Sequence, residues 1–124
     1  MSDFNAVSAA FIQFYYQTFD SDRKALAGLY RPQSMLTFEG QQFVGAENIT
    51  EKLVSLPFQK VQHRISTQDA QPGDPSNGMI LVSVTGALVV DDEQNPTMFS
   101  QTFQLVPEGN SYWVYNDIFR LNYA

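Results

Sequence analysis

The chain has 124 residues, of which 44% are hydrophobic and 14% aromatic, and this length suits one domain spanning residues 1–124. Thirteen acidic residues against seven basic ones give a net charge of −6, which argues against nucleic acid or an anionic membrane surface as a partner. The chain has no cysteine, so disulfides and thiolate chemistry are excluded.

The first half of the chain predicts three helices around a pair of short strands. Apolar residues recur there at spacings of three and four, which is typical of a helix with one apolar face; they are Phe4, Val7, Phe11, Phe14, Tyr15 and Phe19. Pro32 and Pro57 end the other two helical patterns, because proline cannot continue a helix. We expect helices over residues 3–19, 23–30 and 46–56, and strands over 34–38 and 41–45, joined by a turn at 39–40.

The second half predicts strands joined by turns. Residues 60–70 alternate between apolar and polar side chains, and residues 79–90 are rich in β-branched side chains. Two Pro, two Gly, an Asp and an Asn make residues 71–78 a clear turn signal. Further strands are expected over residues 97–106 and 112–123. Helices come early and strands late, which favours an α+β fold with a curved antiparallel sheet.

The last strand carries apolar bulk on both faces. Simple alternation places Trp113, Tyr115, Phe119 and Leu121 on one side and Tyr112, Val114 and Ile118 on the other. A sheet with helices on one face and water on the other alternates more cleanly. Either a β-bulge shifts the alternation within this strand, or a second chain covers the open face and makes a homodimer.

His63 is the only histidine, and Asp117 is an acid within an apolar strand. A lone histidine on an apolar face is commonly a hydrogen-bonded core residue; as a general base it needs an acid within hydrogen-bond reach. Asp117 is one candidate for that acid, but it can equally pair with Arg64 or Arg120. One histidine without cysteine does not make a zinc site unless carboxylates join it, and no cofactor-binding motif is present.

Three consecutive acids, Asp91, Asp92 and Glu93, end the strand expected over 79–90. They are either a solvated hairpin turn or a docking site for Lys and Arg of a partner, since clustered carboxylates speed encounter and fix register. If Glu39 lies nearby, the acids would surround an apolar opening. The side chains of that opening would be Phe38, Leu56 and Met98, and such a site suits an aromatic anchor with basic neighbours.

Three segments resemble the nuclear transport factor 2 family: FYYQTFDSDRKALAGLY, LTFEGQQFVGAENITEKLVSLPFQKVQHRIS and NDIFRLNY. The resemblance extends over essentially the whole chain, so the single domain would be a domain of this family. It implies a cone-shaped fold in which a bent antiparallel sheet wraps around three helices and leaves a cavity at its open end. It also implies homodimers formed by packing of the sheets, with Ile118 at the interface.

The resemblance further implies a non-enzymatic protein that binds the GDP form of the GTPase Ran and FxFG repeats of nucleoporins, and carries Ran into the nucleus without a cofactor. An aromatic ring of Ran enters the cavity in this family, and basic residues of Ran meet acids at its rim. The matching rim acids are Glu39, Asp91 and Glu93, with Asp92 beside them. The matching cavity positions are Phe38, Leu56, Val61, His63, Met98 and Phe119. Phe4 matches an aromatic residue of the FxFG site.

The sequence departs from some members of the family in two places. Phe4 and Phe38 stand where some members have Trp, and residues 94–95 lengthen the acidic turn. The chain lacks a signal peptide and an apolar run of roughly 18 residues, so we expect it in the cytoplasm or the nucleus. The resemblance further implies that it acts in both compartments and at the nuclear pore complex. The alternatives are a small lyase, isomerase or hydrolase using His63 and Asp117, and a bare dimerisation module.

Overall fold

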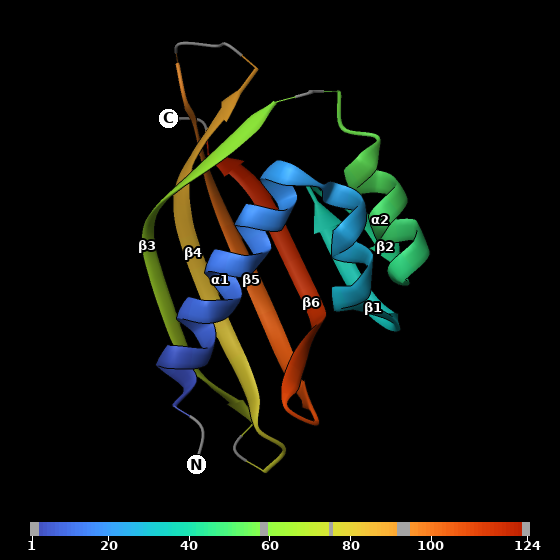
Figure 1. Ribbon diagram of the computed structural model, residues 1–124, viewed down its shortest axis with the longest axis vertical. Coiled ribbons are helices and arrows are strands. Elements are labelled where there is room, and N and C mark those ends of the chain that lie inside the picture. Colours follow the sequence, from blue (N-terminus) through green and yellow to red (C-terminus); the bar gives the residue numbers. More distant parts are fainter. Residues whose placement is uncertain (1–2, 58–59, 75, 92–94, 123–124) are drawn as a thin grey trace.

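The computed structural model describes residues 3–57, 60–74, 76–91 and 95–122. It has the expected order of elements, with helices early and strands late (Figure 1). The helices are α1 (Phe4–Ser21), the 3-10 helix η1 (Arg23–Leu29) and α2 (Ala46–Val54). The strands are β1 (Tyr30–Phe38), β2 (Gln41–Val44), β3 (Val61–Asp74), β4 (Met79–Val90), β5 (Thr97–Glu108) and β6 (Ser111–Asn122). The predicted α+β fold is therefore confirmed.

The six strands form one sheet in the order β2-β1-β6-β5-β4-β3. All neighbouring strands are antiparallel except β1 and β6, which run parallel, with Leu36 opposite Asp117. The expected antiparallel sheet is therefore confirmed, except that β1 and β6 pair in parallel. The last strand lies between β5 and β1, so the end of the chain joins the first hairpin to the long strands. Residues far apart in the sequence thereby meet beside β6.

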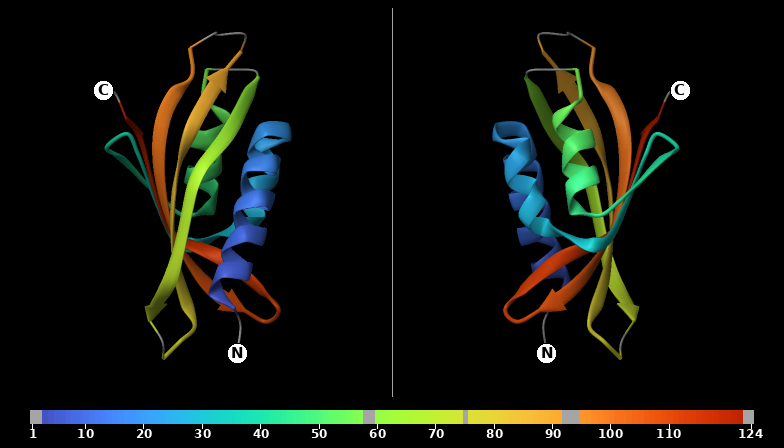
Figure 2. Two further views of the ribbon diagram at one scale, coloured as in Figure 1. Left: turned by 90° about the vertical axis from the view of Figure 1, so that its left-hand side faces the viewer. Right: turned by 90° about the vertical axis from the view of Figure 1, so that its right-hand side faces the viewer.

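The helices lie on one face of the curved sheet, which we call the inner face (Figure 2). The carboxylate of Asp3 caps α1 by accepting a hydrogen bond from the backbone N–H of Asn5 at 3.0 Å. The buried stripe of α1 consists of Ser8, Phe11, Ile12, Tyr15, Tyr16 and Phe19. Phe14, which was expected on this stripe, lies beside it with 53% of its surface exposed.

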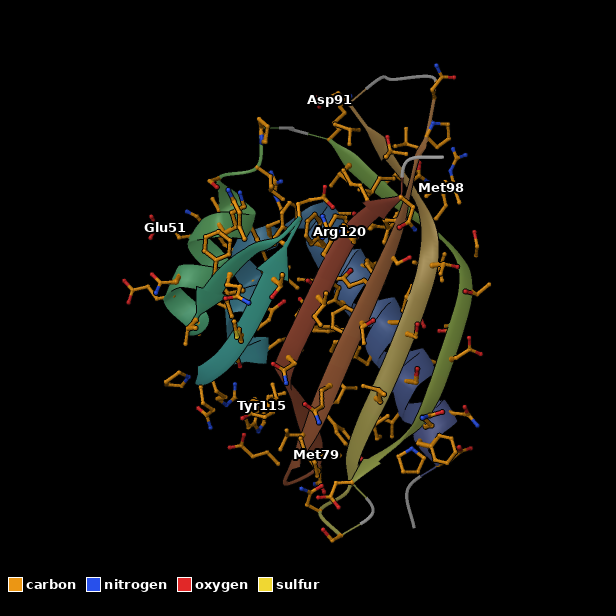
Figure 3. All side chains as sticks on the ribbon, turned by 180° about the vertical axis from the view of Figure 1, so that it is seen from behind. Glu51, Met79, Asp91, Met98, Tyr115 and Arg120 are labelled. Carbon is orange, nitrogen blue, oxygen red and sulfur yellow. The ribbon has the colours of Figure 1, made fainter. Side chains whose placement is uncertain are left out.

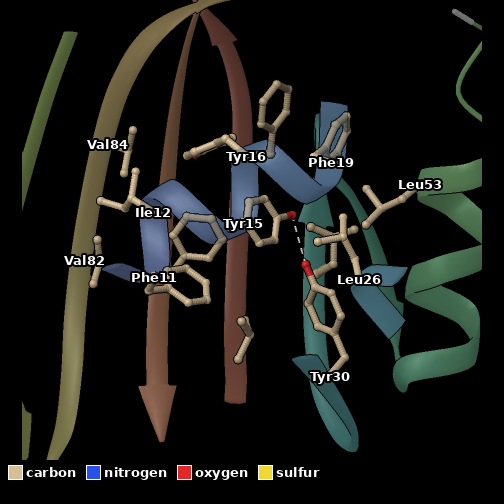
Figure 4. Close-up of a cluster of buried hydrophobic side chains, with 14 of the residues drawn as sticks. Phe11, Ile12, Tyr15, Tyr16, Phe19, Leu26, Tyr30, Leu53, Val82 and Val84 are labelled. Atoms are coloured by element: carbon tan, nitrogen blue, oxygen red, sulfur yellow. Dashed lines mark hydrogen bonds between the residues drawn. The ribbon is translucent and has the colours of Figure 1, made fainter. Parts of the chain in front are cut away.

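The core forms between that stripe and alternate residues of the central strands (Figure 4). Val82 and Val84 of β4, and Phe99, Phe103 and Leu105 of β5, are fully buried, as the period of two in a strand requires. Phe103 contacts α1 through edge-to-face packing against Phe11, with ring centroids 5.0 Å apart. This aromatic packing holds α1 across the middle of the sheet.

A β-bulge in β6 explains why both faces of that strand appeared apolar. Asn116 pairs with Gln104, but Val114 pairs with Leu105, so Tyr115 is an extra residue in β6. The β-bulge, one of the two explanations offered for this strand, is therefore confirmed. Val114 joins Phe119 in the core, which leaves the side chains before and after the bulge out of phase.

The opposite, outer face of the sheet still carries exposed apolar side chains (Figure 3). Their exposed fractions are 37% for Leu81, 47% for Met98, 38% for Tyr115 and 52% for Ile118. The helices cover the inner face alone, so nothing in the described chain covers these residues. None of the helices in the described ranges is both long and apolar enough to cross a membrane.

Candidate functional site

An apolar cavity of about 250 Å³ opens at the end of the sheet where β1, β4 and β6 finish. Its lining residues come from that end of the inner face and from the C-terminal ends of α1 and α2. Figure 1 shows where these elements lie. The lining residues are Tyr15, Phe19, Leu36, Phe38, Leu53, Leu56, Pro57, His63, Leu88, Val90, Thr97, Gln101, Phe119 and Leu121. Most of these side chains are aliphatic or aromatic, which is typical of a site for an apolar ligand or anchor.

Stacked rings build one wall of the cavity. The Phe38 ring at the end of β1 stacks on Phe119 of β6, with centroids 4.8 Å apart and planes 9° apart. Phe119 in turn stacks on Phe99 of β5 at 5.6 Å. The ammonium of Lys52 on α2 lies 5.3 Å from the Phe38 ring centroid, within cation–π range. The parallel pairing of β1 with β6 is what brings Phe38 and Phe119 together.

The structure places four of the six expected cavity residues in the lining: Phe38, Leu56, His63 and Phe119. The placement of the other two in the cavity was wrong. Met98 precedes the inward-facing Phe99, so its side chain lies on the outer face, as Figure 3 shows. Val61 is buried against a separate, more polar depression beside the end of α1.

His63 is held by an acid that the sequence reasoning did not consider. Its ring Nδ1 lies 2.6 Å from Oδ1 of Asp20, and its backbone N–H donates to Oδ2 of the same carboxylate at 3.0 Å. The rings of Tyr16 and Phe19 pack against the imidazole at 4.6 and 4.8 Å. Asp117, the acid that was expected, is not its partner. His63 therefore matches the core-histidine alternative, although one edge of its ring faces the cavity.

Asp117 lies beneath the cavity in what we call the Asp117 network, formed by Tyr15, Tyr16, Tyr30, Gln101 and Asp117. Its Oδ2 accepts hydrogen bonds from the hydroxyls of Tyr30 at 2.8 Å and Tyr15 at 3.4 Å. Its Oδ1 accepts from the amide of Gln101 at 2.7 Å. Tyr15 also bonds to Tyr30, and Tyr16 donates to Gln101 (Figure 4 draws the Tyr15–Tyr30 bond). The alternative of an ion pair between Asp117 and an arginine is not borne out, because both of its oxygens accept from the network.

Burial decides the protonation of this network. Removal from water raises the pKa of Asp117 to about 6, although hydrogen bonds from Gln101, Tyr30 and Tyr15 oppose the shift. Burial, with the nearby Asp117 charge as the second cause, raises the pKa of Tyr15 and Tyr30 well above the ordinary value. The two tyrosines therefore stay neutral donors.

The separate partners of His63 and Asp117 remove the basis of the acid/base pair. His63 is bound by Asp20, and both carboxylate oxygens of Asp117 are occupied by the network. A general base must reach the proton that it abstracts, and Asp117 is 1% exposed. Within the described ranges, no group of three or more His, Asp or Glu is placed to hold a metal ion.

Glu39 stands at the mouth of the cavity in an unusual backbone conformation. It directly follows the lining residue Phe38, and its φ is +52°, a left-handed value that favours glycine. Its backbone N–H donates to the carbonyl of Phe119 at 3.1 Å, and its Oε1 accepts from the N–H of Leu121 at 2.5 Å. The half-buried side chain is thus tied to β6 by one carboxylate oxygen.

Asp91 stands at the same end of the molecule, directly after the lining residue Val90 (Figure 3). It also has a left-handed φ, of +51°; among the described residues only Glu39 and Asp91 combine such a φ with a side chain. Its Oδ1 accepts from the backbone N–H of Lys60 at 3.0 Å, and its side chain is exposed. Asp92 and Glu93, the other expected rim acids, lie outside the described residues.

The remaining expected site residues lie away from the cavity. Phe4 is at the start of α1, at the opposite end of the molecule, and packs half-buried against the core. Ile118 is on the outer face, paired with Thr102 of β5. The roles predicted for Phe4 in FxFG binding and for Ile118 in dimerisation concern surfaces distinct from the cavity.

Sequence reasoning missed most of the cavity lining. Leu88 and Val90 on β4 and Leu121 on β6 belong to it, as do Tyr15 and Gln101 from the Asp117 network. Counting in twos from Phe119 reaches Leu121, and counting in twos from Leu88 reaches Val90, so strand alternation could have found these pairs. Gln101 follows the same alternation from Phe99, but its side chain is polar, and its burial depends on hydrogen bonds with Tyr16 and Asp117 that the sequence does not show.

Comparisons with known proteins agree with this geometry. A family model described as the nuclear transport factor 2 (NTF2) domain matches residues 7–121. Nuclear transport factor 2 of Debaryomyces hansenii is 68% identical over 122 residues, covering 98% of each chain. That of Saccharomyces cerevisiae is 64% identical, covering 98% of this chain and 97% of its own. The solved structure of nuclear transport factor 2 from Cryptosporidium parvum has a TM-score of 0.89 at 52% identity, covering 96% of this chain and 94% of that one.

The Asp117 network predicts a specific pH dependence of stability. Asp117 has a pKa of about 6 in the folded chain and an ordinary value of 3.8 when exposed, so the folded state binds its proton more tightly. Its contribution to the free energy of unfolding therefore grows as pH falls through 6. We expect a gain of about 1 kcal/mol between about pH 7 and about pH 5. Asp117→Asn, which keeps the shape and one acceptor oxygen but cannot ionise, should lack it.

Urea unfolding of both proteins at the two pH values measures this difference, and other titrating groups cancel in the comparison. Equal pH dependence in the wild type and in Asp117→Asn would contradict the assignment of a raised pKa to Asp117.

Proposed function

The chain belongs to the nuclear transport factor 2 family, and on that premise we propose that it binds the GDP form of the GTPase Ran and carries it into the nucleus. The high identity to curated nuclear transport factors assigns it a role in nuclear transport and makes it a transport factor, not an enzyme. The proposal adds the identity of the cargo, the surfaces that bind it, and the route through the nuclear pore complex between cytoplasm and nucleus.

The observation that carries the proposal is an apolar cavity with carboxylates at its mouth. An aromatic ring of Ran would enter between Phe38, Phe119 and Leu56 and lose its contact with water there. Burying an aromatic side chain is the main source of affinity in such a pocket. The cavity volume of about 250 Å³ is larger than the roughly 150 Å³ that holds a benzene molecule in an engineered core.

The acids at the mouth would select the partner by charge. Glu39 keeps one carboxylate oxygen bonded to the Leu121 N–H, and we propose that the other meets a basic residue of Ran. Asp91, directly after β4, would likewise meet a basic residue of Ran, together with Asp92 and Glu93. A net charge of −6 adds a general attraction for a basic surface, which speeds encounter more than it strengthens the final complex.

A second surface would bind FxFG repeats of nucleoporins through Phe4. Phe4 is the first residue of α1, and the start of α1 lies at the far end of the molecule from the ends of β1 and β4 that border the cavity (Figure 1). Ran and a nucleoporin could therefore be bound at the same time. Simultaneous binding is what a carrier needs while it crosses the pore.

We propose that the outer face forms the homodimer, with Ile118 at its centre. Leu81, Met98 and Ile118 are each at least 37% exposed on this face, and the helices lie on the other side of the sheet. Exposed apolar patches of this kind mark interaction sites. A two-fold dimer would bury the patch against its own copy and leave both cavities open, because they lie on the inner faces.

The charge at the mouth gives the first prediction. Glu39→Gln keeps an oxygen to accept from the Leu121 N–H but removes the negative charge, so folding should be unchanged. We expect affinity for Ran-GDP to fall about tenfold at low salt, and less at high salt, because screening weakens the lost attraction. Calorimetric titration measures this. Glu47→Gln is the matched control. Glu47 is in the first turn of α2, whereas the cavity lies at the C-terminal end of that helix, so this variant should bind like the wild type. Unchanged affinity in Glu39→Gln would remove Glu39 from the site.

The nucleoporin surface gives the second prediction. Phe4→Ala should weaken binding of an FxFG peptide about tenfold or more, since it removes the ring proposed to contact the repeat. Affinity for Ran-GDP should not change, because the cavity is at the other end of the molecule. Fluorescence anisotropy with a labelled peptide checks the first part and calorimetry the second. Undiminished peptide binding would leave the alternative of a bare dimerisation module in place.

The outer face gives the third prediction. Ile118→Arg places a charge in the proposed interface, where a like charge from the second copy would face it, and should convert the dimer into monomers. Light scattering after size-exclusion chromatography should give twice the 14.0 kDa chain mass for the wild type and the chain mass for the variant. Circular dichroism serves as the control for folding. A wild type that is already monomeric would refute the interface.

A further inference from the structure

The cavity contains few polar groups, and all but one of those in its interior have their hydrogen bonds made within the protein. Four polar side chains line it: Tyr15, His63, Thr97 and Gln101. Both amide atoms of Gln101 are bonded within the Asp117 network, and so is the Tyr15 hydroxyl. Thr97 is the first residue of β5, at the mouth. His63 is therefore the one interior group with an atom left for a ligand.

The atom in question is Nε2 of His63. The side chain is only 2% exposed, and its Nδ1 is directed at Asp20, which lies outside the cavity. A carboxylate only accepts hydrogen bonds, so the proton of that contact is on Nδ1. Among the described residues Nε2 has no hydrogen-bond partner, while the ring contributes to the cavity wall. Nε2 is not among the fully buried unpaired atoms, so it is accessible from the cavity. A ligand that displaces water from this nitrogen without a matching group would leave it unpaired at a cost in free energy.

The surroundings of this nitrogen define the shape of that ligand. Rings of Phe19, Phe38 and Phe119 and aliphatic side chains such as Leu53 and Leu88 line the remaining space. The volume of about 250 Å³ accommodates one substituted six-membered ring. The carboxylates at the mouth disfavour an anion, so the ligand is neutral.

We infer that the cavity is a binding site for a neutral monocyclic phenol, whose ring occupies the apolar space and whose hydroxyl bonds to Nε2 of His63. A hydroxyl both donates and accepts, so it matches His63 in either protonation state. An unsubstituted ring fills the same space but leaves Nε2 unpaired and cut off from water. The phenol would occupy the same cavity as the proposed aromatic ring of Ran, but its binding does not require that Ran binds there.

The test compares two ligands that differ by one hydroxyl. The protein is titrated with p-cresol and with toluene and followed by amide and side-chain chemical shifts in NMR. We expect p-cresol to bind about tenfold more tightly than toluene, with the largest shifts at cavity residues such as Leu88 and Phe119. Equal affinities, or shifts concentrated on the outer face, would overturn the inference.

A matched variant assigns the preference to His63. His63→Leu keeps an apolar side chain of similar size, and the backbone N–H of residue 63 still bonds to Asp20. Toluene should bind as before and the preference for p-cresol should disappear; a preserved preference would overturn the inference. If the variant does not fold, the comparison of the two ligands on the wild type still decides.

Two further arms separate the source of the phenol from the question of Ran. N-acetyltyrosinamide and N-acetylphenylalaninamide show whether a protein side chain enters in the same way: a preference for the tyrosine derivative supports a tyrosyl source, and binding of p-cresol alone supports a free small molecule. Adding p-cresol should lower the affinity for Ran-GDP, since both would occupy the cavity. Binding of p-cresol without any binding of Ran-GDP would refute the proposed cargo and leave this inference standing.

Discussion

The buried Asp117 network is the constraint on which the other features depend. Asp117 on β6, Tyr15 on α1, Tyr30 on β1 and Gln101 on β5 meet at one carboxylate, so four elements are held in one arrangement. A buried carboxylate is tolerable only when its oxygens are hydrogen-bonded, and here both are. Any shift of α1 along the sheet would break at least one of these bonds. The network thus fixes the distance of α1 from the sheet below the cavity.

The cavity follows from that arrangement. Packing between α1 and the central strands is complete beside Phe103, whereas towards the C-terminal ends of α1 and α2 the curved sheet diverges from the helices and leaves space. The strand ends that border this space also place two acids there, because Glu39 follows β1 and Asp91 follows β4. Their left-handed backbone conformations cost free energy, and residues kept in such conformations cluster at functional sites. The apolar lining of the cavity and the acids at its mouth are therefore both supplied by the ends of the same strands.

The sequence predicted the elements well because their signals are local. The aromatic spacing in α1, the proline that follows α2 and the β-branched residues of the strands are signals that need no knowledge of distant residues. The failures concern contacts made at long range. The broken alternation of the last strand indicated a possible bulge but not its position, and the bulge at Tyr115 places Trp113 and Phe119 on opposite faces. The pairing of His63 with Asp20 joins residues 43 positions apart, and the position of Met98 depends on the direction in which Phe99 points. The functional expectations came from family resemblance rather than from these patterns.

One measurement tests the central claim that an apolar cavity receives a ring of Ran-GDP. Leu88→Phe adds a ring from β4 into the same space, where it should fill the cavity without exposing any core residue. Calorimetric titration of this variant with Ran-GDP, with unfolding measured in parallel, separates occupancy of the cavity from loss of structure. We expect stability equal to or above that of the wild type, together with loss of detectable Ran-GDP binding. A stable variant that binds Ran-GDP with wild-type affinity would contradict it.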